Sequence, residues 1–460
     1  MTGRWLRRTL GGALALVALV LIVLWLGLRA SLPTLDGEIV VAGIDDVVTI
    51  ARDADGIPVI TASNRYDLAY ATGYAHGQDR FFQMDLIRRK AAGELSELVG
   101  AAAINADRRY RFHRFRARAA AVFEAATEAD RRLMQSYAAG VNAGLNSLSA
   151  KPFEYFVLGS EPRAWNALDS LLAVYAMYMD LNDSRATKEI RRGMAHSVLP
   201  PEVYSWMYPQ GTSWDAPIMG APLEVPPIPS ADVYSIRDVP DDAPPANEQG
   251  RYPLRGSNNW AVSGALTANG RALVANDMHL GHRVPNIWYQ ARLRVPGPEG
   301  RDVTGVTLPG SPFVISGSNT QVAWGYTNSY GDWTDAVVLR PGATEGTYQT
   351  PEGDREFVAY VETINVKGGD PVKYEIRETI WGPVIDDVDY PAGEVVVSWI
   401  AHKPEGINLN LLKLERARSV AEALDIANTM SMPPQNFVTG DAGGNIGWTI
   451  AGQIPRKSGF

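Results

Sequence analysis

The sequence predicts an α+β protein, and the order of its patterns along the chain supports this prediction. From residue 64 to about residue 206, apolar residues recur with helical spacing. Residues 221–256 then hold eight prolines and show little periodicity, as linkers do. After this stretch, apolar and polar residues alternate as in half-buried strands. Helices, a linker and strands in this order fit an α+β body in which the linker divides the chain.

Composition places the chain among globular proteins and excludes several functions. Its 460 residues suffice for two or three domains or for one large body. Hydrophobic residues make up 46% and charged residues 20%, as in globular proteins. The net charge of −8 argues against a nucleic-acid-binding surface. The chain has no cysteine, which excludes disulfides, thiolate nucleophiles and cysteine metal sites and suits an exported protein.

The first 31 residues predict a signal peptide or a membrane anchor. Arg4, Arg7 and Arg8 precede residues 11–28, eighteen uncharged and mainly apolar residues at the lower limit of a membrane span. The Arg7-Arg8 pair also fits a twin-arginine signal. The sequence LRASLP that follows is a poor cleavage site, which favours an uncleaved anchor. The body of the protein would then face the periplasm or the cell exterior.

The region before the linker predicts two strands and then helices. Short apolar runs in residues 38–62 are interrupted by DADGIP, which is a turn signal. Helical patterning covers residues 64–100 and continues through DRRYRFHRFRARAAAVFEAA. The arginines of this basic sequence predict a solvated helical face rather than an anion site; they are Arg108, Arg109, Arg111, Arg114, Arg116 and Arg118.

The region after the linker predicts strands with one late helix. Four segments have the two-residue periodicity of strands: NWAVSG, RALVAN, WYQARLRV and QVAWGYT. The segment SVAEALDIANTM has helical spacing. No internal repeat is present.

The Gly256-Ser257 step opens the first of these strands and suggests a nucleophile. A serine hydroxyl needs a base to react, and the absence of G-x-S-x-G excludes a nucleophile elbow. A serine released as a chain terminus would have its own α-amine as base, which requires cleavage after Gly256. Glycine tolerates the strained backbone that attack on its carbonyl needs. The alternative is a loop that ends at this step.

Several separated motifs resemble the penicillin acylase-type N-terminal nucleophile (Ntn) hydrolases, nearer their cephalosporin and acyl-homoserine lactone acylase branches. The resemblance covers residues 45–460 and lies in GSNNWAV, DADGIPVITA, AHGQDRFFQMDLIRRKAAGELSELVG, LVANDMHL, LPGSPFVISGSNTQVAWGYTNSYGDWTD and PPQNFVTGDAGGNIGWTIAGQIP. It implies a four-layer αββα sandwich. Residues 32–220 would form the α-subunit region, 221–256 an excised spacer and 257–460 the start of the β-subunit, with both subunits in one body.

The resemblance also implies roles for single residues. Ser257 would attack an amide carbonyl with its α-amine as base and form an ester acyl-enzyme. The backbone N–H of Asn328 would be one oxyanion donor. His279 matches the histidine that orients or polarises the serine; its alternative role is a hydrogen-bonded histidine at a strand end.

By the same resemblance, Leu280, Ser316 and Tyr326 occupy acyl-pocket positions. They differ from a phenyl-accepting set, which leaves a straight acyl chain or a glutaryl-like group open. The substrate would be an N-acyl amide, either a β-lactam side chain in antibiotic metabolism or an acyl-homoserine lactone.

A structural calcium site is also implied by the resemblance. Its ligands would be Glu189, Asp332, the Thr334 carbonyl and Asp335, and carboxylates with a carbonyl suit Ca²⁺. An acidic turn with a helix cap is the alternative. No organic cofactor is expected.

Family members are longer than this chain, so we expect a fragment or a degenerate member with an incomplete fold. A second oxyanion donor would lie beyond residue 460. Two other functions stay open. One is a metallohydrolase that uses Asp277, His279 and His282, whose spacing suits zinc. The other is an inactive, membrane-tethered binding or scaffold protein.

Overall fold

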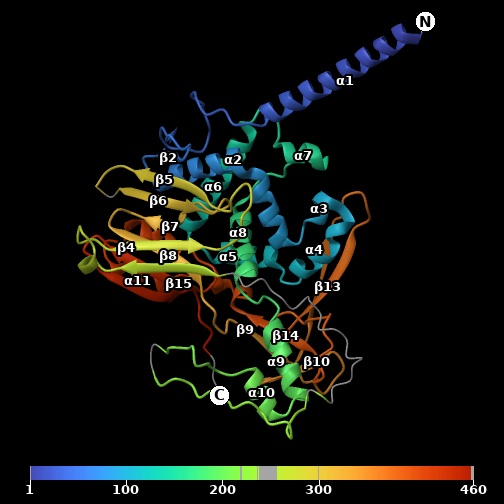
Figure 1. Cartoon of the computed structure of the whole chain (residues 1–460), viewed down its shortest axis with the longest axis vertical. Helices are drawn as coiled ribbons and strands as arrows, with labels where there is room; N and C mark the ends of the chain where they lie inside the picture. Colours follow the sequence, from blue (N-terminus) through green and yellow to red (C-terminus); the bar gives the residue numbers. More distant parts are fainter. Residues whose placement is uncertain (1, 218–219, 236, 238–255, 299, 457–460) are drawn as a thin grey trace.

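The computed structural model describes residues 2–217, 220–235, 237, 256–298 and 300–456. Half of the expected spacer, residues 238–255 with the last four of its eight prolines, lies outside the described residues. Helices fill the region before it, and strands dominate the region after it (Figure 1). The α+β prediction is therefore confirmed.

The helices of the first region pack around two long central helices, α2 and α6. The helical elements are α1 (Thr2–Ala30), α2 (Arg65–Ala92), α3 (Ser96–Val99), α4 (Ile104–Arg111), α5 (Phe115–Ala125), α6 (Glu128–Asn146), α7 (Phe153–Leu158), α8 (Ala167–Leu181), α9 (Thr187–Val198), α10 (Pro201–Met207) and, late in the chain, α11 (Val420–Ala427).

Glycines let α2 and α6 approach closely. A methyl group on Gly73 would overlap the Tyr137 carbonyl oxygen, and one on Gly140 would overlap the carbonyl oxygen of Tyr70. Only glycine fits where two helix backbones meet at this distance. The side chain of Asn64 accepts hydrogen bonds from the first turn of α2 and so fixes its start.

An eight-stranded sheet joins both regions of the chain. Its order is β1 (Thr49–Arg52), β2 (Pro58–Thr61), β5 (Tyr289–Val295), β6 (Arg301–Thr307), β7 (Val314–Ser318), β8 (Val322–Asn328), β15 (Gln435–Asp441) and β16 (Ile446–Ala451). Strand β2 pairs with β5 in parallel, and the other neighbours are antiparallel. Residues before and after the spacer thus share one sheet.

The remaining strands form two-stranded pairs. They are β3 (Ser257–Val262) with β4 (Leu273–Met278), β9 (Thr334–Val338) with β14 (Val395–Trp399), β10 (Thr347–Thr350) with β11 (Gly353–Glu356), and β12 (Val358–Ile364) with β13 (Val372–Glu378). The β3–β4 pair contacts β8 and β15 of the large sheet. All predicted strands and the late helix occur as expected.

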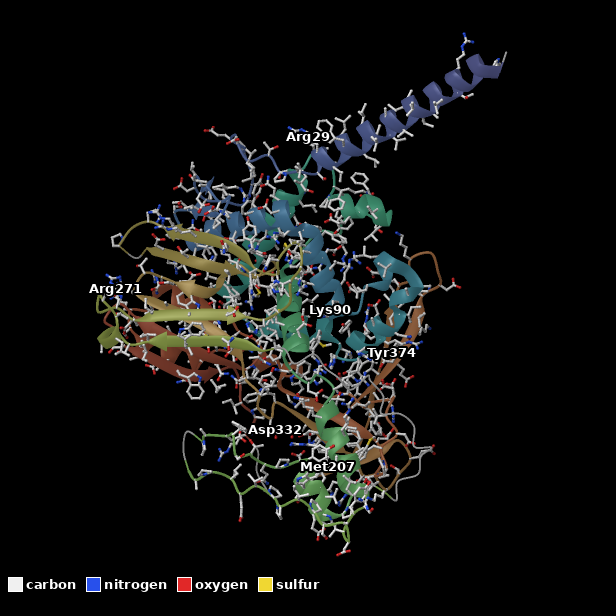
Figure 2. The ribbon with its side chains drawn as sticks, in the orientation of Figure 1. Arg29, Lys90, Met207, Arg271, Asp332 and Tyr374 are labelled. Carbon is white, nitrogen blue, oxygen red and sulfur yellow. The ribbon has the colours of Figure 1, made fainter. Side chains whose placement is uncertain are left out.

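Helix α1 extends away from the body (Figure 1). Its segment Arg8–Ala30 has a mean hydropathy of 2.6, is 0% buried and is long enough to cross a membrane. Figure 2 shows Arg29 at the end of α1 where it joins the body, and Arg271 at the far edge of the sheet. A signal sequence has the same properties, so this helix is consistent with export.

The prediction of a solvated arginine face on residues 108–118 is wrong for four of its six residues. Arg111 pairs with Glu362 (3.1 Å), Arg116 with Glu94 (2.6 Å), and Arg114 and Arg118 pair with Glu378 (3.3 and 2.7 Å). Only Arg108 and Arg109 are exposed. The partners of the four paired arginines are distant in sequence, so helical spacing could not indicate them.

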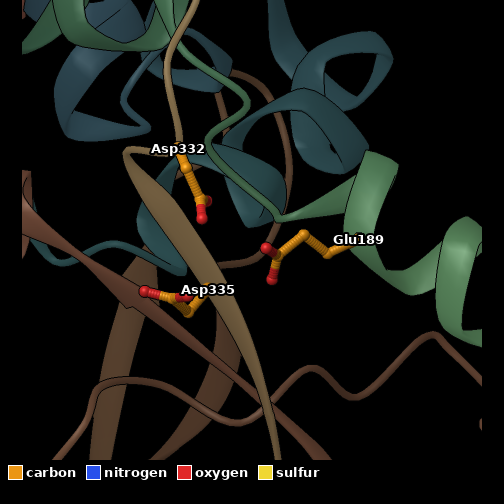
Figure 3. Close-up of side chains that lie close together, drawn as sticks. All are labelled: Glu189, Asp332 and Asp335. Atoms are coloured by element: carbon orange, nitrogen blue, oxygen red, sulfur yellow. The ribbon is translucent and has the colours of Figure 1, made fainter. Parts of the chain in front are cut away.

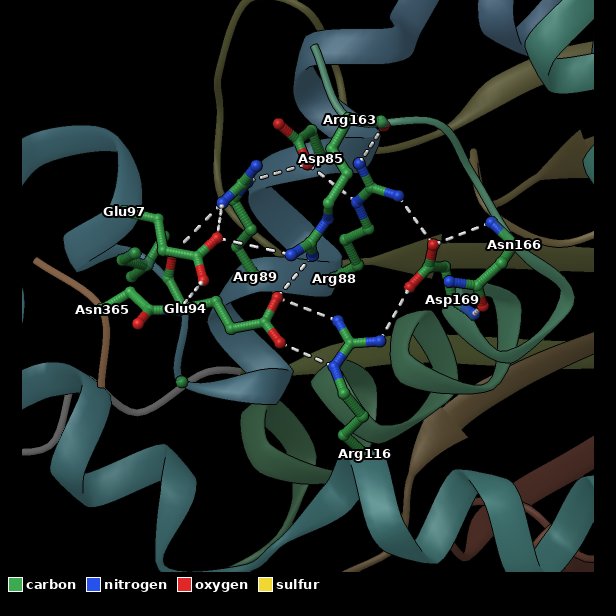
Figure 4. Close-up of polar contacts among 12 residues, drawn as sticks. Asp85, Arg88, Arg89, Glu94, Glu97, Arg116, Arg163, Asn166, Asp169 and Asn365 are labelled. Carbon is green, nitrogen blue, oxygen red and sulfur yellow. Dashed lines mark hydrogen bonds and ion pairs between the residues drawn. The ribbon is translucent and has the colours of Figure 1, made fainter. Parts of the chain in front are cut away.

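A buried ionic network fixes the motif AHGQDRFFQMDLIRRKAAGELSELVG (Figure 4). The fully buried Arg88 donates to Asp85 (2.7 Å) and Asp169 (2.6 Å) and to the carbonyls of Arg163 and Ala164. Burial raises the pKa of Glu94, but hydrogen bonds and charge from its arginine neighbours outweigh burial and lower it to about 2. The network joins α2, α8 and the loop between α7 and α8.

Protonation of buried His76 should make stability depend on pH. Its Nδ1 contacts the Tyr137 hydroxyl (2.8 Å) and its Nε2 contacts Thr307 Oγ1 (2.9 Å). Burial, with a smaller effect of Arg80, lowers its pKa to about 3. Below pH ~6.5 the unfolded chain binds a proton that the folded chain does not, so stability falls as the pH decreases toward 3.

We expect the free energy of unfolding, measured by urea titration, to fall as the pH is lowered from about 7.5 to about 5. His76→Gln should make the slope of this fall smaller by up to roughly 1.4 kcal/mol per pH unit. The control is His282→Gln, because His282 is exposed. Equal pH dependence in the wild type and His76→Gln would contradict this prediction.

Candidate active site

Ser257 is the first residue of β3 and lies opposite Met278 on β4. Its hydroxyl oxygen accepts a hydrogen bond from the backbone N–H of His279 (3.3 Å). The strand pairing therefore holds the serine hydroxyl beside the residue that follows β4.

The ring of His279 is directed toward Asp277 rather than toward the serine hydroxyl. His279 Nε2 lies 2.8 Å from Asp277 Oδ2, and both side chains are largely exposed. The ring Nδ1 lies beside Gly256, 3.6 Å from the position that a Cβ would take there. His279 thus contacts Ser257 through its main chain and flanks the Gly256-Ser257 step with its ring.

The zinc-type grouping of Asp277, His279 and His282 does not form. Among the described residues, the acidic or histidine ligand atoms that converge within 4.8 Å are those of Glu189, Asp332 and Asp335. The pairing of His279 with Asp277 explains their spacing, and the exposed His282 does not join them. The described residues therefore do not bring these three side chains together as a set of zinc ligands.

A largely apolar cavity of about 100 Å³ lies beside Ser257. It is lined from both regions of the chain, since α8 contributes Val174, Met177 and Leu181. Leu280 and Tyr326 line it as expected, together with Ser257 and Asn328. The other lining residues are Met278, Trp288, Leu308, Ser311, Phe313, Ile315, Thr327, Asn408, Leu411, Met430, Ser431, Met432, Pro433 and Gln435, so none of the lining side chains is charged.

Ser316 lies outside the cavity lining. Its hydroxyl donates to Asn276 Oδ1 (3.0 Å) and lies within hydrogen-bond distance of the Trp324 carbonyl (3.0 Å). Ile315, the preceding residue of β7, lines the cavity instead, because consecutive residues of a strand face opposite sides.

Asn328, the last residue of β8, also lines the cavity. Its side chain is fixed, since Nδ2 donates to the Leu181 carbonyl (2.9 Å) and Oδ1 accepts from Gln435 (3.2 Å). The Ser329 N–H donates to the carbonyl of Pro434, the residue before β15. Because backbone N–H groups point alternately to the two sides of a strand, the N–H of the preceding Asn328 is directed away from β15. On the opposite side of β8, its pairing with β7 includes only Ala323 and Trp324 and so ends before Asn328.

Asn276 on β4 is a residue that the sequence analysis missed. Its amide group pairs with the backbone of Tyr326, because Nδ2 donates to the Tyr326 carbonyl (2.8 Å) and Oδ1 accepts from the Tyr326 N–H (3.1 Å). The same Nδ2 reaches the carbonyl of Asn258 (3.2 Å), next to Ser257. Gly325 permits this approach, since a Cβ there would lie 2.8 Å from Asn276 Cβ. Asn276 thus ties the serine strand to β8, and its only sequence signal is a polar residue in the motif LVANDMHL.

Substitution of Asn276 should disturb the site more than the fold. We expect Asn276→Ala to lower the rate of any reaction at the Ser257 hydroxyl by up to about 10²-fold, because small displacements of reacting groups have such effects. Steady-state kinetics would measure this, with Asn269→Ala, an exposed residue of the β3–β4 hairpin, as the control. Equal rates for the two variants would contradict a role for Asn276 in positioning.

Three carboxylates from both regions of the chain converge where α9 approaches β9 (Figure 3). Glu189 lies on α9, Asp332 follows β8 and Asp335 lies on β9, and their oxygen atoms fall within 4.8 Å of one another. Glu189 Oε2 also accepts a hydrogen bond from the Ala336 N–H (2.6 Å). Thr334 begins β9 beside them and is buried. Carboxylates at this separation repel one another, and a hard cation with oxygen ligands fits such a group.

Comparison with known proteins gives consistent results. The family model for penicillin amidase matches residues 47–459. Penicillin acylase 2 proenzyme of Pseudomonas sp. (strain SE83) is 31% identical over 435 residues, which are 94% of this chain and 55% of that protein. The acyl-homoserine lactone acylase QuiP of Pseudomonas fluorescens (strain Pf0-1) is 26% identical over 93% of this chain and 53% of its own length.

Among solved structures, the thermostable penicillin G acylase from Alcaligenes faecalis matches 43% of this chain and 35% of its own chain, with 26% identity and a TM-score of 0.38. The chain spans about half the length of the curated relatives it matches. Because the family model covers nearly all of the sequence beyond α1, the chain belongs to the penicillin amidase family.

Proposed function

We propose that the chain is part of an amidohydrolase that cleaves itself between Gly256 and Ser257 and then hydrolyses N-acyl amides through Ser257. The observation that carries this proposal is the position of the Ser257 hydroxyl, at the start of β3, in the wall of an apolar cavity that Asn328 also lines. Membership of the penicillin amidase family supports it further.

In self-cleavage, the Ser257 hydroxyl attacks the Gly256 carbonyl carbon, and the peptide C–N bond breaks to leave an ester and a free α-amine. Water then hydrolyses the ester and separates the two chains. In substrate hydrolysis, the α-amine takes the hydroxyl proton while the oxygen attacks the amide carbonyl. The amine product leaves with that proton, and water releases the acid from Ser257.

Two main-chain groups have proposed roles in these steps. The Asn328 N–H, turned away from β15, would donate to the oxyanion. The His279 N–H donates to the Ser257 hydroxyl oxygen and would orient it. The His279 ring, beside Gly256, would assist the cleavage step.

The lining of the cavity favours a neutral, apolar acyl group. Leu280, Phe313, Ile315 and Tyr326 give it apolar walls, and no lining side chain is cationic. A glutaryl group would bury its carboxylate there without a partner, which is costly. Among the open substrates, this favours acyl-homoserine lactones or β-lactams with aliphatic side chains, and the names of the relatives agree with both.

Intact-mass and N-terminal analysis of the purified chain tests the proposal directly. A fragment that begins Ser-Asn-Asn-Trp is expected. A chain that stays uncut and releases no amine from an N-alkanoyl amide would contradict the proposal and favour a binding or scaffold role.

We further propose that Glu189, Asp332, Asp335 and the Thr334 carbonyl hold a structural Ca²⁺ ion. The convergence of three carboxylates from α9, from β9 and from the segment between β8 and β9 supports this, because an ion there would join the regions before and after the proposed cleavage point. The ion would take no part in the chemistry.

Removal of this ion should lower stability. We expect EGTA to lower the Tm. If the Ca²⁺ concentration before chelation is one hundred times the Kd, the stabilisation that EGTA removes is about 2.7 kcal/mol. Glu189→Gln should remove most of the response to Ca²⁺, whereas Glu202→Gln, at an exposed position of α10, should retain it. An unchanged Tm in EGTA would contradict the calcium site.

The two regions would become subunits of one heterodimer, with residues 32–220 and 257–460 as its parts. The sheet shared between β2 and β5 and the contact of β3–β4 with β8 support this and the four-layer αββα fold. We also propose that α1 anchors the protein, with its amino-terminal arginines on the cytoplasmic side and the body in the periplasm.

A further inference from the structure

Helix α7 exposes an apolar cluster on one face. Phe153, Phe156 and Val157 are 46%, 53% and 80% exposed. Their spacing of i, i+3 and i+4 places the three side chains on the same side of the helix. We call these three residues the α7 cluster. Large apolar side chains grouped on a surface mark a contact with a partner or a membrane.

Helix α1 has the features of a span whose ends lie at the two membrane surfaces. The uncharged residues 11–28 would extend about 27 Å along a helix, close to the hydrocarbon thickness of a bilayer, and the exposed Trp25 stands near their end on the side of the body. Tryptophans favour the two interfaces. Arg29 lies over the Trp25 ring (5.7 Å), so the end of α1 near the body carries an aromatic residue and a cation.

The α7 cluster lies beside this end of α1. The Ala150 N–H donates to the Ala30 carbonyl (3.0 Å), and α7 begins three residues later at Phe153. Figure 1 shows α7 next to the point where α1 leaves the body. If α1 spans a bilayer, its hydrogen bond to Ala150 brings α7 to the membrane surface.

The two ends of α7 are held to the body by polar contacts. Lys367 donates to the Leu158 carbonyl and to Ser160 Oγ, and Lys151 pairs with Glu161 (2.5 Å) and lies over the Phe156 ring (4.9 Å). Both ends of the short helix are therefore attached, and its exposed face keeps one orientation relative to α1.

We propose that the α7 cluster inserts into the interfacial layer of the same bilayer that α1 spans, as a second contact that fixes the orientation of the protein on the membrane. Short amphipathic helices bind interfaces in this way through their apolar face. The proposal rests on the anchoring role of α1.

The absence of cysteine allows a direct test with single labels. The full chain carrying Val157→Cys would be labelled with the environment-sensitive dye NBD and reconstituted into vesicles of phosphatidylethanolamine and phosphatidylglycerol. Leu266→Cys is the matched control, because Leu266 is 82% exposed and lies in the β3–β4 hairpin, near Arg271 at the far edge of the sheet. Leu19→Cys reports whether α1 itself enters the bilayer.

We expect a blue-shifted emission at positions 19 and 157 and severalfold stronger quenching there by nitroxide lipids than at position 266. Lipid contact at position 19 with an aqueous signal at position 157 would overturn the α7 contact and leave the anchor. Aqueous signals at both positions would overturn both. Equal quenching at 157 and 266 would show nonspecific adsorption of the body and would also overturn the proposal.

Discussion

Replacement of Ser257 by alanine should abolish both self-cleavage and amide hydrolysis. The hydroxyl oxygen is the proposed nucleophile of both reactions, and alanine offers none. We expect the chain to remain uncut, and hydrolysis of an N-alkanoyl p-nitroanilide to fall by at least about 10⁴-fold. Mass spectrometry measures the first effect, and release of p-nitroaniline measures the second.

Ser263→Ala is the matched control for this variant. Ser263 follows the last residue of β3, and its hydroxyl lies 3.2 Å from the Gly444 carbonyl, away from the cavity lining. This variant should cleave and hydrolyse like the wild type. Persistent hydrolysis in Ser257→Ala would assign the chemistry to another group. Retained hydrolysis in an uncut wild-type chain would show that the terminal amine is not the base.

Replacement of Arg88 by methionine should cause the largest loss of stability. Arg88 is 0% exposed, and its two acidic partners, Asp85 and Asp169, are 0% exposed as well. Methionine has a similar volume, but it removes the positive charge of Arg88 from beside the two buried carboxylates. It also leaves two main-chain carbonyls without the guanidinium donor. Removal of one partner from a buried ionic group costs about 3–5 kcal/mol. Urea unfolding followed by circular dichroism measures the change.

Arg355→Met provides the same chemical change at the surface. Arg355 is 49% exposed and pairs with Glu352, which is 77% exposed. Exposed pairs contribute about 0–1 kcal/mol, so this variant should unfold close to the wild type. If Arg88→Met were as stable as Arg355→Met, the network would not be a main source of stability in the helical region.

The sequence by itself was sufficient to predict the order of the helices and strands and the position of the candidate nucleophile. Strands β3, β4, β5 and β8 and helix α11 occur where periodicity predicted them. Alternation and helical spacing act over a few residues, so local sequence contains the necessary information. The Gly256-Ser257 step at the start of a strand is equally local.

The tertiary structure decided which residues that are distant in sequence meet, at Ser257 and elsewhere. Asn276 reaches Tyr326 across 50 positions of sequence, and Glu189 reaches Ala336 across 147. The arginines expected in solvent find acidic partners up to 264 positions away. His279 turns its ring to Asp277, and Ile315 takes the place at the cavity that was expected of Ser316. Such contacts depend on how the sheets and helices pack against one another, and the periodicity of a single segment contains no information about that packing.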